Sequence, residues 1–547
     1  MKAHLLFADR DFDFAADLQP LHDDVIRDLE LAGVLRAMAR GDRVLLDVSS
    51  KVLMASLSDV GEVLYRQDVL KDCIEHEEMV RELYALVVAA LEDKRGIWSI
   101  RSTTSSITLH GAVAQLEAFF ARLQTLRRLA DEHVEQVRSE GMRNLFSSLR
   151  EDLDDDYLET LRGHLRRLQF RDGVLLSARL DRDNTGVDYV LRSPGTRRTG
   201  WRERVHLAPR TSYSFTIPPR DDAGMNDLAE LTSRGLNHVA NAAAQAADHI
   251  ESYFTMLRSE LAFYVSCLNL RSTLLERETP LVFPVPLASS PVRFSCAELF
   301  DMSLVLHTSG PVVGNSVEAD DRPLVVITGA NSGGKTTFLR SVGLAQLMLQ
   351  CGMYVAASSY RASLHSGVLT HFGREEDATM RSGRLDDELR RLDLIVDGTA
   401  RHSLVLFNES FAGTNEREGS EIGRQVVRAL LERDVSVFFV THQFDLADGF
   451  RRSRPATTRF LRAERAPDGW PSYKLIPAEP LPTSFAVDVY RRIGGFGIGG
   501  FGTAPESLEG ARRRTVEEGT SAPAEPGASR SENGGAARDR PRRTSPP

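Results

Sequence analysis

A nine-residue stretch at 329–337, Gly-Ala-Asn-Ser-Gly-Gly-Lys-Thr-Thr, has the residue types and the spacing of a phosphate-binding loop. Glycines allow consecutive backbone N–H groups to point inward around phosphate oxygens. Lys335 is expected to reach the β- and γ-phosphates of a nucleotide, and the Thr336 hydroxyl is expected to ligate Mg²⁺. The predicted nucleotide-binding residues are Gly329, Ala330, Asn331, Ser332, Gly333, Gly334, Lys335, Thr336 and Thr337.

The segments on either side of this loop support that interpretation. An apolar, β-branched run at 324–328 predicts a strand before the loop, and residues 338–350 have helical spacing without proline after it. The amino end of such a helix adds a partial positive charge, which favours an anion. A glycine-rich turn that only resembles such a loop is the alternative, and it would not require a strand and a helix in this order.

A second polar pair follows an apolar strand at 403–407, as in a Walker B strand. The acidic residues of such a strand hold the water shell of Mg²⁺ and polarise the attacking water. Glu409 is therefore the candidate general base, and Asn408 joins Thr336 as a candidate metal-site residue. Asn408 stands where Asp is usual and brings no charge. We expect weaker Mg²⁺ binding, which argues against fast hydrolysis.

A third apolar run at 435–440 ends in Thr441-His442. A histidine directly after this strand is placed to contact the γ-phosphate, and we count His442 with Glu409 as a catalytic candidate. Alone, it would be an ordinary structural histidine. Its place after a phosphate-binding loop and a Walker B strand favours the functional role.

The composition is that of an ordinary soluble protein of several domains, with 547 residues, 42% of them hydrophobic, and a net charge of −9. No apolar run approaches the ~20 residues that span a bilayer. The amino-terminal residues include acids where a signal peptide has an apolar core, so we expect a cytoplasmic protein without a membrane partner. Four cysteines without metal spacing are predicted to be reduced thiols.

The order of the predicted elements divides the chain into four parts. An α/β nucleotide-binding domain at 291–495 follows a mainly helical core or lever region at 61–290, which contains a small β insert at 171–220. A segment at 1–60 precedes them, and a low-complexity tail at 496–547 is predicted to be disordered. We expect helices at 18–39, 113–137, 154–168 and 227–275, strands at 174–178, 187–191 and 213–217, and a linker at 280–291.

The β insert carries ten arginines, no lysine and five acidic residues. Arginine neutralises phosphates, and an aromatic residue can stack or wedge between bases. Long helices on both sides indicate a lever with the insert at its tip; a compact helical domain with a surface hairpin is the alternative. The alternative to nucleic-acid binding is that the arginines form a charged hairpin face that contacts only solvent. The candidate DNA-binding residues are Arg197, Arg198, Trp201, Arg202 and Arg204.

The three motifs in this order resemble the ATPase domain of the MutS family of DNA mismatch repair proteins, within the wider ABC/SMC-like group. Residues 381–389 are similar to the family's signature segment, with either Ser382 or Gly383 as the signature residue. Residues 484–489 are similar to the segment that closes the domain. The resemblance covers about 60–495.

This resemblance implies an ATP- and Mg²⁺-dependent homodimer, in which each ATP lies between the phosphate-binding loop of one subunit and the signature segment of the other. ATP binding and hydrolysis would switch a clamp that holds mismatched, branched or damaged DNA. The first sixty residues have no Phe-x-Glu mismatch motif, and a glycine-rich run at 494–500 stands where the family has a dimerising helix-turn-helix. We therefore expect a MutS-like ATPase without the mismatch-recognition domain.

Two other functions stay open on these residues. The missing mismatch motif and the acidic balance fit a nucleotide-gated switch that binds RNA, the ribosome or a protein partner. Asn408 fits a protein with slow turnover that only senses ATP. Competition between DNA, RNA and ribosomes separates the first alternative from a DNA clamp.

Overall fold

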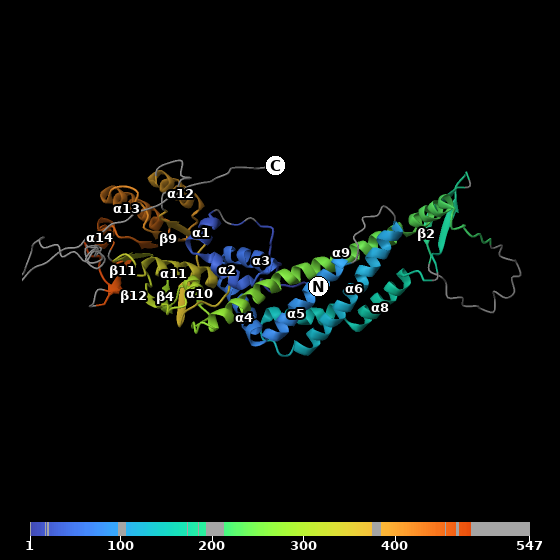
Figure 1. Ribbon diagram of the computed structural model, residues 1–547, viewed down its shortest axis with the longest axis horizontal. Helices are drawn as coiled ribbons and strands as arrows, with labels where there is room; N and C mark the ends of the chain where they lie inside the picture. The colour runs from blue at the N-terminus through green and yellow to red at the C-terminus, as the bar shows by residue number, and fades with distance from the viewer. Residues whose placement is uncertain are drawn as a thin grey trace, which may run out of the picture. The chain divides into compact units, whose positions relative to one another are not determined.

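Helices make up most of the first half of the chain, and two sheets with their covering helices make up most of the second half (Figure 1). The computed structural model describes residues 2–16, 18, 21–96, 105–171, 173–183, 185–192, 213–374, 384–454, 456–466 and 470–482. Residues 1–490 form one unit, and the predicted tail lies outside the described residues.

The helical half consists of nine helices and one hairpin among the described residues. The helices before the hairpin are α1 (His22–Asp28), α2 (Leu31–Ala39), α3 (Arg43–Met54), α4 (Val60–Glu75), α5 (Glu77–Gly96), α6 (Ser105–His133), α7 (Glu140–Asp152) and α8 (Asp155–Leu168). The hairpin pairs β1 (Leu176–Leu180) with β2 (Gly186–Leu191) in an antiparallel arrangement, and α9 (Asp222–Leu275) follows.

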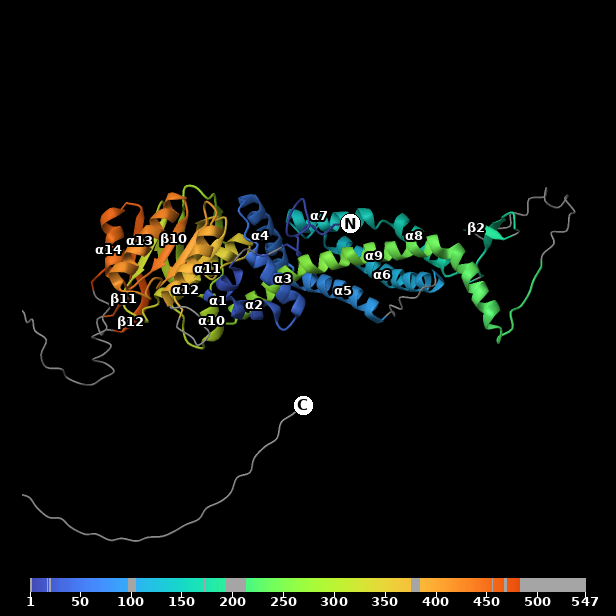
Figure 2. The ribbon, with the colours of Figure 1, turned by 90° about the horizontal axis from the view of Figure 1, so that it is seen from above.

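Helix α9 connects the hairpin with the nucleotide-binding half. Its 54 residues extend over about 80 Å at 1.5 Å per residue. Both views show it alongside α5 and α6, against which it packs (Figure 2). Near its start, Gly235 gives room to Leu176 of the hairpin, and near its end the Cys267 carbonyl accepts a 2.7 Å bond from the Tyr354 hydroxyl.

Within the described residues of the second half, the strands form two sheets. The six-stranded sheet has the order β12-β11-β6-β10-β9-β8, and every neighbouring pair except β11–β12 is parallel. Its strands are β6 (Leu324–Thr328), β8 (Val368–Phe372), β9 (Leu404–Asn408), β10 (Ser436–Val440), β11 (Thr458–Arg465) and β12 (Pro471–Pro477). The four-stranded sheet has the order β3-β7-β4-β5, from β3 (Val285–Leu287), β4 (Phe294–Leu299), β5 (Asn315–Glu318) and β7 (Ser359–Ser363).

Alternate residues of the six-stranded sheet enter two different cores, as a two-residue period requires. Val325 and Ile327 join the core that contains α11 (Lys335–Gln350), whereas Leu324 and Val326 join a second core. The second core is closed by α12 (Arg384–Gly398), α13 (Glu416–Glu432) and α14 (Phe444–Ser453). A short helix, α10 (Met302–His307), follows β4.

The amino-terminal segment is built into the helical core through buried polar side chains. Glu260 of α9 is fully buried, and its carboxylate accepts bonds from the backbone N–H groups of Leu5, Leu6 and Phe12 at 2.5–3.4 Å. The buried Arg66 of α4 donates to the Leu6 carbonyl at 2.7 Å. The segment therefore obtains backbone partners from side chains instead of from a sheet.

Several predicted elements are confirmed, and three are wrong. The helix expected at 154–168 is α8, which Asp154 caps by accepting from the Tyr157 N–H at 2.7 Å. The single helix expected at 18–39 is two helices, because Glu30 takes a left-handed conformation with φ 51°. The expected linker contains β3, which pairs with β7, and the expected strand at 213–217 has no regular structure.

Among the described residues, we find no helix that is both long and apolar enough to span a bilayer.

Candidate nucleotide-binding site

Three strand ends bring the predicted site residues together. Strand β10 lies between β6 and β9 and is parallel to both. The carboxyl ends of parallel strands meet at one edge of a sheet, where α/β proteins bind ligands. The phosphate-binding loop follows β6, Glu409 follows β9, and His442 follows β10. Motifs separated by up to about a hundred residues in sequence therefore meet at one edge.

The glycines of the loop are required by close contacts and by backbone conformation. A Cβ on Gly333 would lie 2.7 Å from the Ala463 Cβ, and one on Gly329 would lie 2.9 Å from the same atom. Gly329 and Gly334 have φ of 120° and 86°, which glycine adopts without strain. Gly334 also precedes α11 without any side-chain cap. The first N–H groups of α11 are therefore left for an anion.

Lys335 lies beneath the loop and is almost fully buried. Its ammonium donates to the carbonyls of Gly329 at 3.1 Å and Ala330 at 3.0 Å, which leaves its third N–H for a phosphate oxygen. Burial lowers the pKa of Lys335, and the nearby Glu409 carboxylate opposes that shift. A bound phosphate would supply the negative charge that this buried cation lacks.

Thr336 and Asn408, the two predicted metal-site residues, contact each other. The Thr336 hydroxyl donates to the Asn408 side-chain oxygen at 3.0 Å. This orientation leaves lone pairs of the Thr336 oxygen available, and hydroxyl and amide oxygens are the hard ligands that suit Mg²⁺. The pair fits Mg²⁺ chemically but offers no carboxylate at this position.

Glu409 and His442 lie side by side at the sheet edge. The distance from the His442 Nδ1 to a Glu409 carboxylate oxygen is 4.0 Å, and the side chains are 41% and 38% exposed. Glu409 lines the cavity in front of the loop, and its own N–H donates to the Val440 carbonyl at 2.9 Å. A partly exposed carboxylate in this position can contact a water molecule next to a γ-phosphate.

The cavity has a volume of about 420 Å³ and two unlike walls. The polar wall consists of residues 331–337 together with Glu409 and Asn315. The apolar wall is formed by Leu304 of α10, by Pro311, Val312 and Val313 of the following loop, and by Tyr473 of β12. An apolar wall next to a phosphate site suits a nucleotide base. The sequence did not indicate this wall, because its residues come from a short helix, a loop and a strand that carry no motif.

The other predicted site residues lie outside the described residues. These are the signature residues Ser382 and Gly383 and the DNA-binding candidates Arg197, Arg198, Trp201, Arg202 and Arg204. Their roles stay predictions.

A second cavity, which we call the arginine groove, lies between α6 and α8. It has a volume of about 380 Å³ and is lined by Glu117, Phe120, Arg162, Leu165, Arg166, Gln169 and Arg171. The Arg162 guanidinium lies 5.3 Å from the centre of the Phe120 ring. Three arginines and one glutamate make this groove electropositive.

The parallel sheet, the glycine-rich loop and the two-walled cavity define a P-loop nucleotide-binding domain. Two known domain families match the chain: the MutS2 N-terminal domain over residues 58–277 and MutS domain V, a P-loop ATPase domain, over 325–494. The chain belongs to the MutS family.

Individual relatives agree with this assignment. "Endonuclease MutS2" of Thermus thermophilus is 33% identical over 207 residues, which are 37% of this chain and 27% of that protein. "DNA mismatch repair protein MutS" of Thermus aquaticus is 33% identical over 167 residues, or 30% and 20% of the two chains. An "Endonuclease MutS2" of Streptococcus equi is 26% identical over 302 residues, or 53% and 37%. The chain spans less than two fifths of the length of each of these relatives.

Proposed function

We propose that the protein is an ATP-dependent DNA-binding protein of the MutS type, which acts as a homodimer and uses ATP and Mg²⁺ to switch its grip on DNA. The observation that carries this proposal is the cavity in which residues 331–337, Glu409 and an apolar wall surround one space. Membership of the MutS family supports the choice of DNA and of DNA repair as the setting.

The residues of the site divide the chemistry among them. Lys335 and the free N–H groups of α11 hold the phosphates. Thr336 and Asn408 would hold Mg²⁺, which would supply positive charge next to the phosphates. Glu409 accepts the proton of the attacking water or orients that water towards the γ-phosphate. His442 contacts the γ-phosphate beside Glu409.

The first test measures ATP turnover of the purified protein alone and with duplex, mismatched or branched DNA. We expect DNA to change the rate and Glu409→Ala to lower it by about 100-fold or more, as for loss of a general base. The DNA that changes the rate most identifies the substrate class. A rate that no DNA alters would contradict the DNA part of the proposal.

The arginine groove supports the nucleic-acid part of the proposal, because arginine neutralises phosphates irrespective of base sequence. Arg162, Arg166 and Arg171 are all replaced by glutamine in one variant. The slope of log affinity against log salt concentration is expected to become shallower by the amount that corresponds to about three phosphate contacts. Glutamine at the exposed Arg401, Arg428 and Arg433 is the matched control. The same experiment on Arg197, Arg198, Arg202 and Arg204 tests the insert.

A slow, nucleotide-gated switch is the second candidate function, and the Thr336–Asn408 contact favours it. Without a carboxylate at position 408 the site would hold Mg²⁺ less tightly. Bound ATP would then be hydrolysed slowly and would spend most of its time intact in the site. In that case Asn408→Asp raises the turnover rate. An unchanged or lower rate would argue against this candidate, and competition between DNA, RNA and ribosomes would identify the partner.

A further inference from the structure

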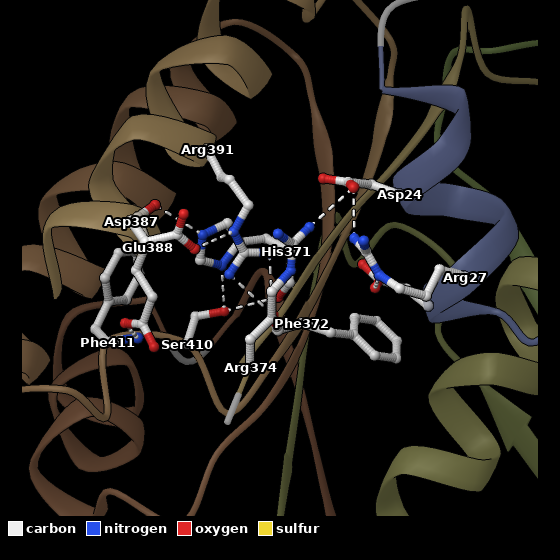
Figure 3. A network of polar contacts seen from close by, with 11 residues as sticks. Asp24, Arg27, His371, Phe372, Arg374, Asp387, Glu388, Arg391, Ser410 and Phe411 are labelled. Carbon is white, nitrogen blue, oxygen red and sulfur yellow. Dashed lines mark hydrogen bonds and ion pairs between the residues drawn. The ribbon is translucent and has the colours of Figure 1, made fainter. Parts of the chain in front are cut away.

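The loop that follows Glu409 is held by a buried polar network from β8 and α12 (Figure 3). Its backbone is unusual: Glu409 has φ 53° and Phe411 has φ 64°, in the left-handed region that L-residues seldom adopt. Such a conformation persists only where its surroundings fix it. The contacts that fix this loop therefore decide where the Glu409 carboxylate lies.

One contact comes from the side chain of Glu388, in the second turn of α12. Its carboxylate accepts the Phe411 N–H at 2.9 Å, and Glu388 is only 1% exposed. The Phe411 carbonyl accepts from the Gln443 side-chain amide at 3.2 Å. The N–H and the carbonyl of the residue two positions after Glu409 are thus both held by side chains from outside the loop.

A second contact runs through His371 of β8, which is fully buried. Burial, assisted by the nearby Arg391 cation, lowers the pKa of His371 to about 4, so the ring is neutral. Its Nε2 lies 3.0 Å from the Glu388 carbonyl and donates to it. The Nδ1 is therefore an acceptor. The Ser410 hydroxyl lies 2.7 Å from this Nδ1 and 2.8 Å from the His371 carbonyl, and it donates its one proton to one of the two. Either bond ties the residue next to Glu409 to His371, whose ring in turn contacts the backbone of α12.

The helix that carries Glu388 is itself anchored to β8. The Arg391 guanidinium, one turn further along α12, donates to the Phe372 carbonyl at 3.1 and 3.2 Å and pairs with Asp387 at 3.2 Å. Beside it, Arg374 pairs with Asp24 of α1 at 2.8 Å. The Glu388 side chain thus extends from a helix, α12, that Arg391 holds against β8.

We propose that Glu388 is a positioning residue, whose carboxylate holds the Phe411 N–H and thereby sets the Glu409 carboxylate in front of the phosphate-binding loop. This inference rests on the proposed ATPase function of the same site. Glu388 does not line the nucleotide cavity, so its effect falls on the rate of hydrolysis and leaves nucleotide affinity unchanged.

The test compares kcat and KM for ATP, and the affinity for a fluorescent ATP analogue, in the wild type, Glu388→Ala, Glu388→Gln and Asp393→Ala. We expect Glu388→Ala to lower kcat by about 10- to 100-fold, as misplacement by about an ångström does, with unchanged affinity. Glu388→Gln keeps an oxygen for the Phe411 N–H and is expected to stay within about threefold of wild type. Asp393 is an exposed acidic residue of the same helix that lies outside residues 381–389, and it is the matched control.

Three results would overturn the inference: an unchanged kcat in Glu388→Ala, an equal loss in Glu388→Gln, or a loss of analogue affinity that parallels the loss of kcat. A wild type without turnover would instead contradict the proposed function, and the wild-type rate separates the two failures. If Glu388→Ala does not fold, Glu388→Asp replaces it. That variant keeps the carboxylate but draws it back from the Phe411 N–H by one methylene, and a kcat equal to that of the wild type would overturn the proposal.

Discussion

At the scale of single residues, the nucleotide site depends on contacts between segments that are distant in sequence. Gly333 is needed because Ala463 of β11 occupies the space next to it, and the Thr336 hydroxyl donates to Asn408, which lies 72 positions further along the chain. Neither Ala463 nor Tyr473 belongs to a recognisable motif. Substitutions at these positions are therefore informative tests of the site.

Gly333→Ala is expected to weaken nucleotide binding by about tenfold or more, because its new methyl group would lie within 2.7 Å of the Ala463 methyl. Adding Ala463→Gly removes that contact and is expected to restore part of the affinity. Titration with a fluorescent nucleotide measures both. Equal affinities of the single and double variants would show that this contact does not limit the loop.

Glu260 predicts a dependence of stability on pH. Burial raises the pKa of Glu260 from 4.5 to about 7. The hydrogen bonds that its carboxylate accepts from three backbone N–H groups act in the opposite direction and lower the pKa. The folded state therefore binds the proton more tightly than the unfolded state. The resulting stabilisation is complete below pH 4.5 and is lost as the pH rises to about 7, by roughly 3 kcal/mol in total.

Urea unfolding of wild type and Glu260→Gln across pH 4.5–7 measures this effect. Glutamine cannot ionise, so the difference in unfolding free energy between the two proteins is expected to change with pH in that window. A difference that stays constant would show that Glu260 does not titrate there.

At the scale of elements, the central strand, loop and helix of the site could be predicted, because their signal is local. A β-branched run, a glycine pattern and a helical period lie within 27 consecutive residues, at 324–350. The apolar wall and the contact between α1 and β8 could not be predicted, since each depends on which segments pack together. The break at Glu30 was missed because no glycine or proline marks it.

The contact of α11 with α10 and α2 provides a prediction at this scale. Arg340 of α11 pairs with the fully buried Asp301, which also caps α10, and with Glu30 before α2. Burial raises the pKa of Asp301, and the Arg340 cation opposes this shift. Arg340→Met leaves an unpaired buried carboxylate and is expected to lower the free energy of unfolding by roughly 3–5 kcal/mol.

Arg401→Met is the control for this prediction, because Arg401 pairs with Asp434 on the surface. Its expected cost is below about 1 kcal/mol. Denaturant unfolding compares the two variants, and equal costs would contradict a structural role for the buried pair.

At the scale of the whole molecule, the amino-terminal segment and the nucleotide-binding half share one hydrophobic core. Asp28 of α1 accepts from Thr370 of β8 at 2.8 Å, and Leu29 packs against Gly343 of α11. The Leu57 N–H donates to the Gln350 carbonyl at 3.0 Å. Residues before the matched MutS2 domain thus complete the support of the nucleotide-binding half.

Deletion of residues 1–40 is therefore expected to destabilise the nucleotide-binding half, although none of these residues lines the nucleotide cavity. Thermal unfolding with and without ATP measures the effect, and a synthetic peptide of residues 1–57 is expected to restore part of the loss. Deletion of residues 503–547, which lie within the predicted tail, is the control. Unchanged nucleotide-dependent stability in the first deletion would contradict this view.

The partnership of Asp28 with Thr370 also affects how the chain is made. The two residues are 342 positions apart, and at about 5–20 residues per second a ribosome needs roughly 20–70 s between them. During that interval the apolar side chains of α1 and α2 have left the ribosome before the strands that will cover them exist. Chaperones or transient contacts within the nascent chain must therefore cover the apolar faces of its first helices until the last part of the core is synthesised.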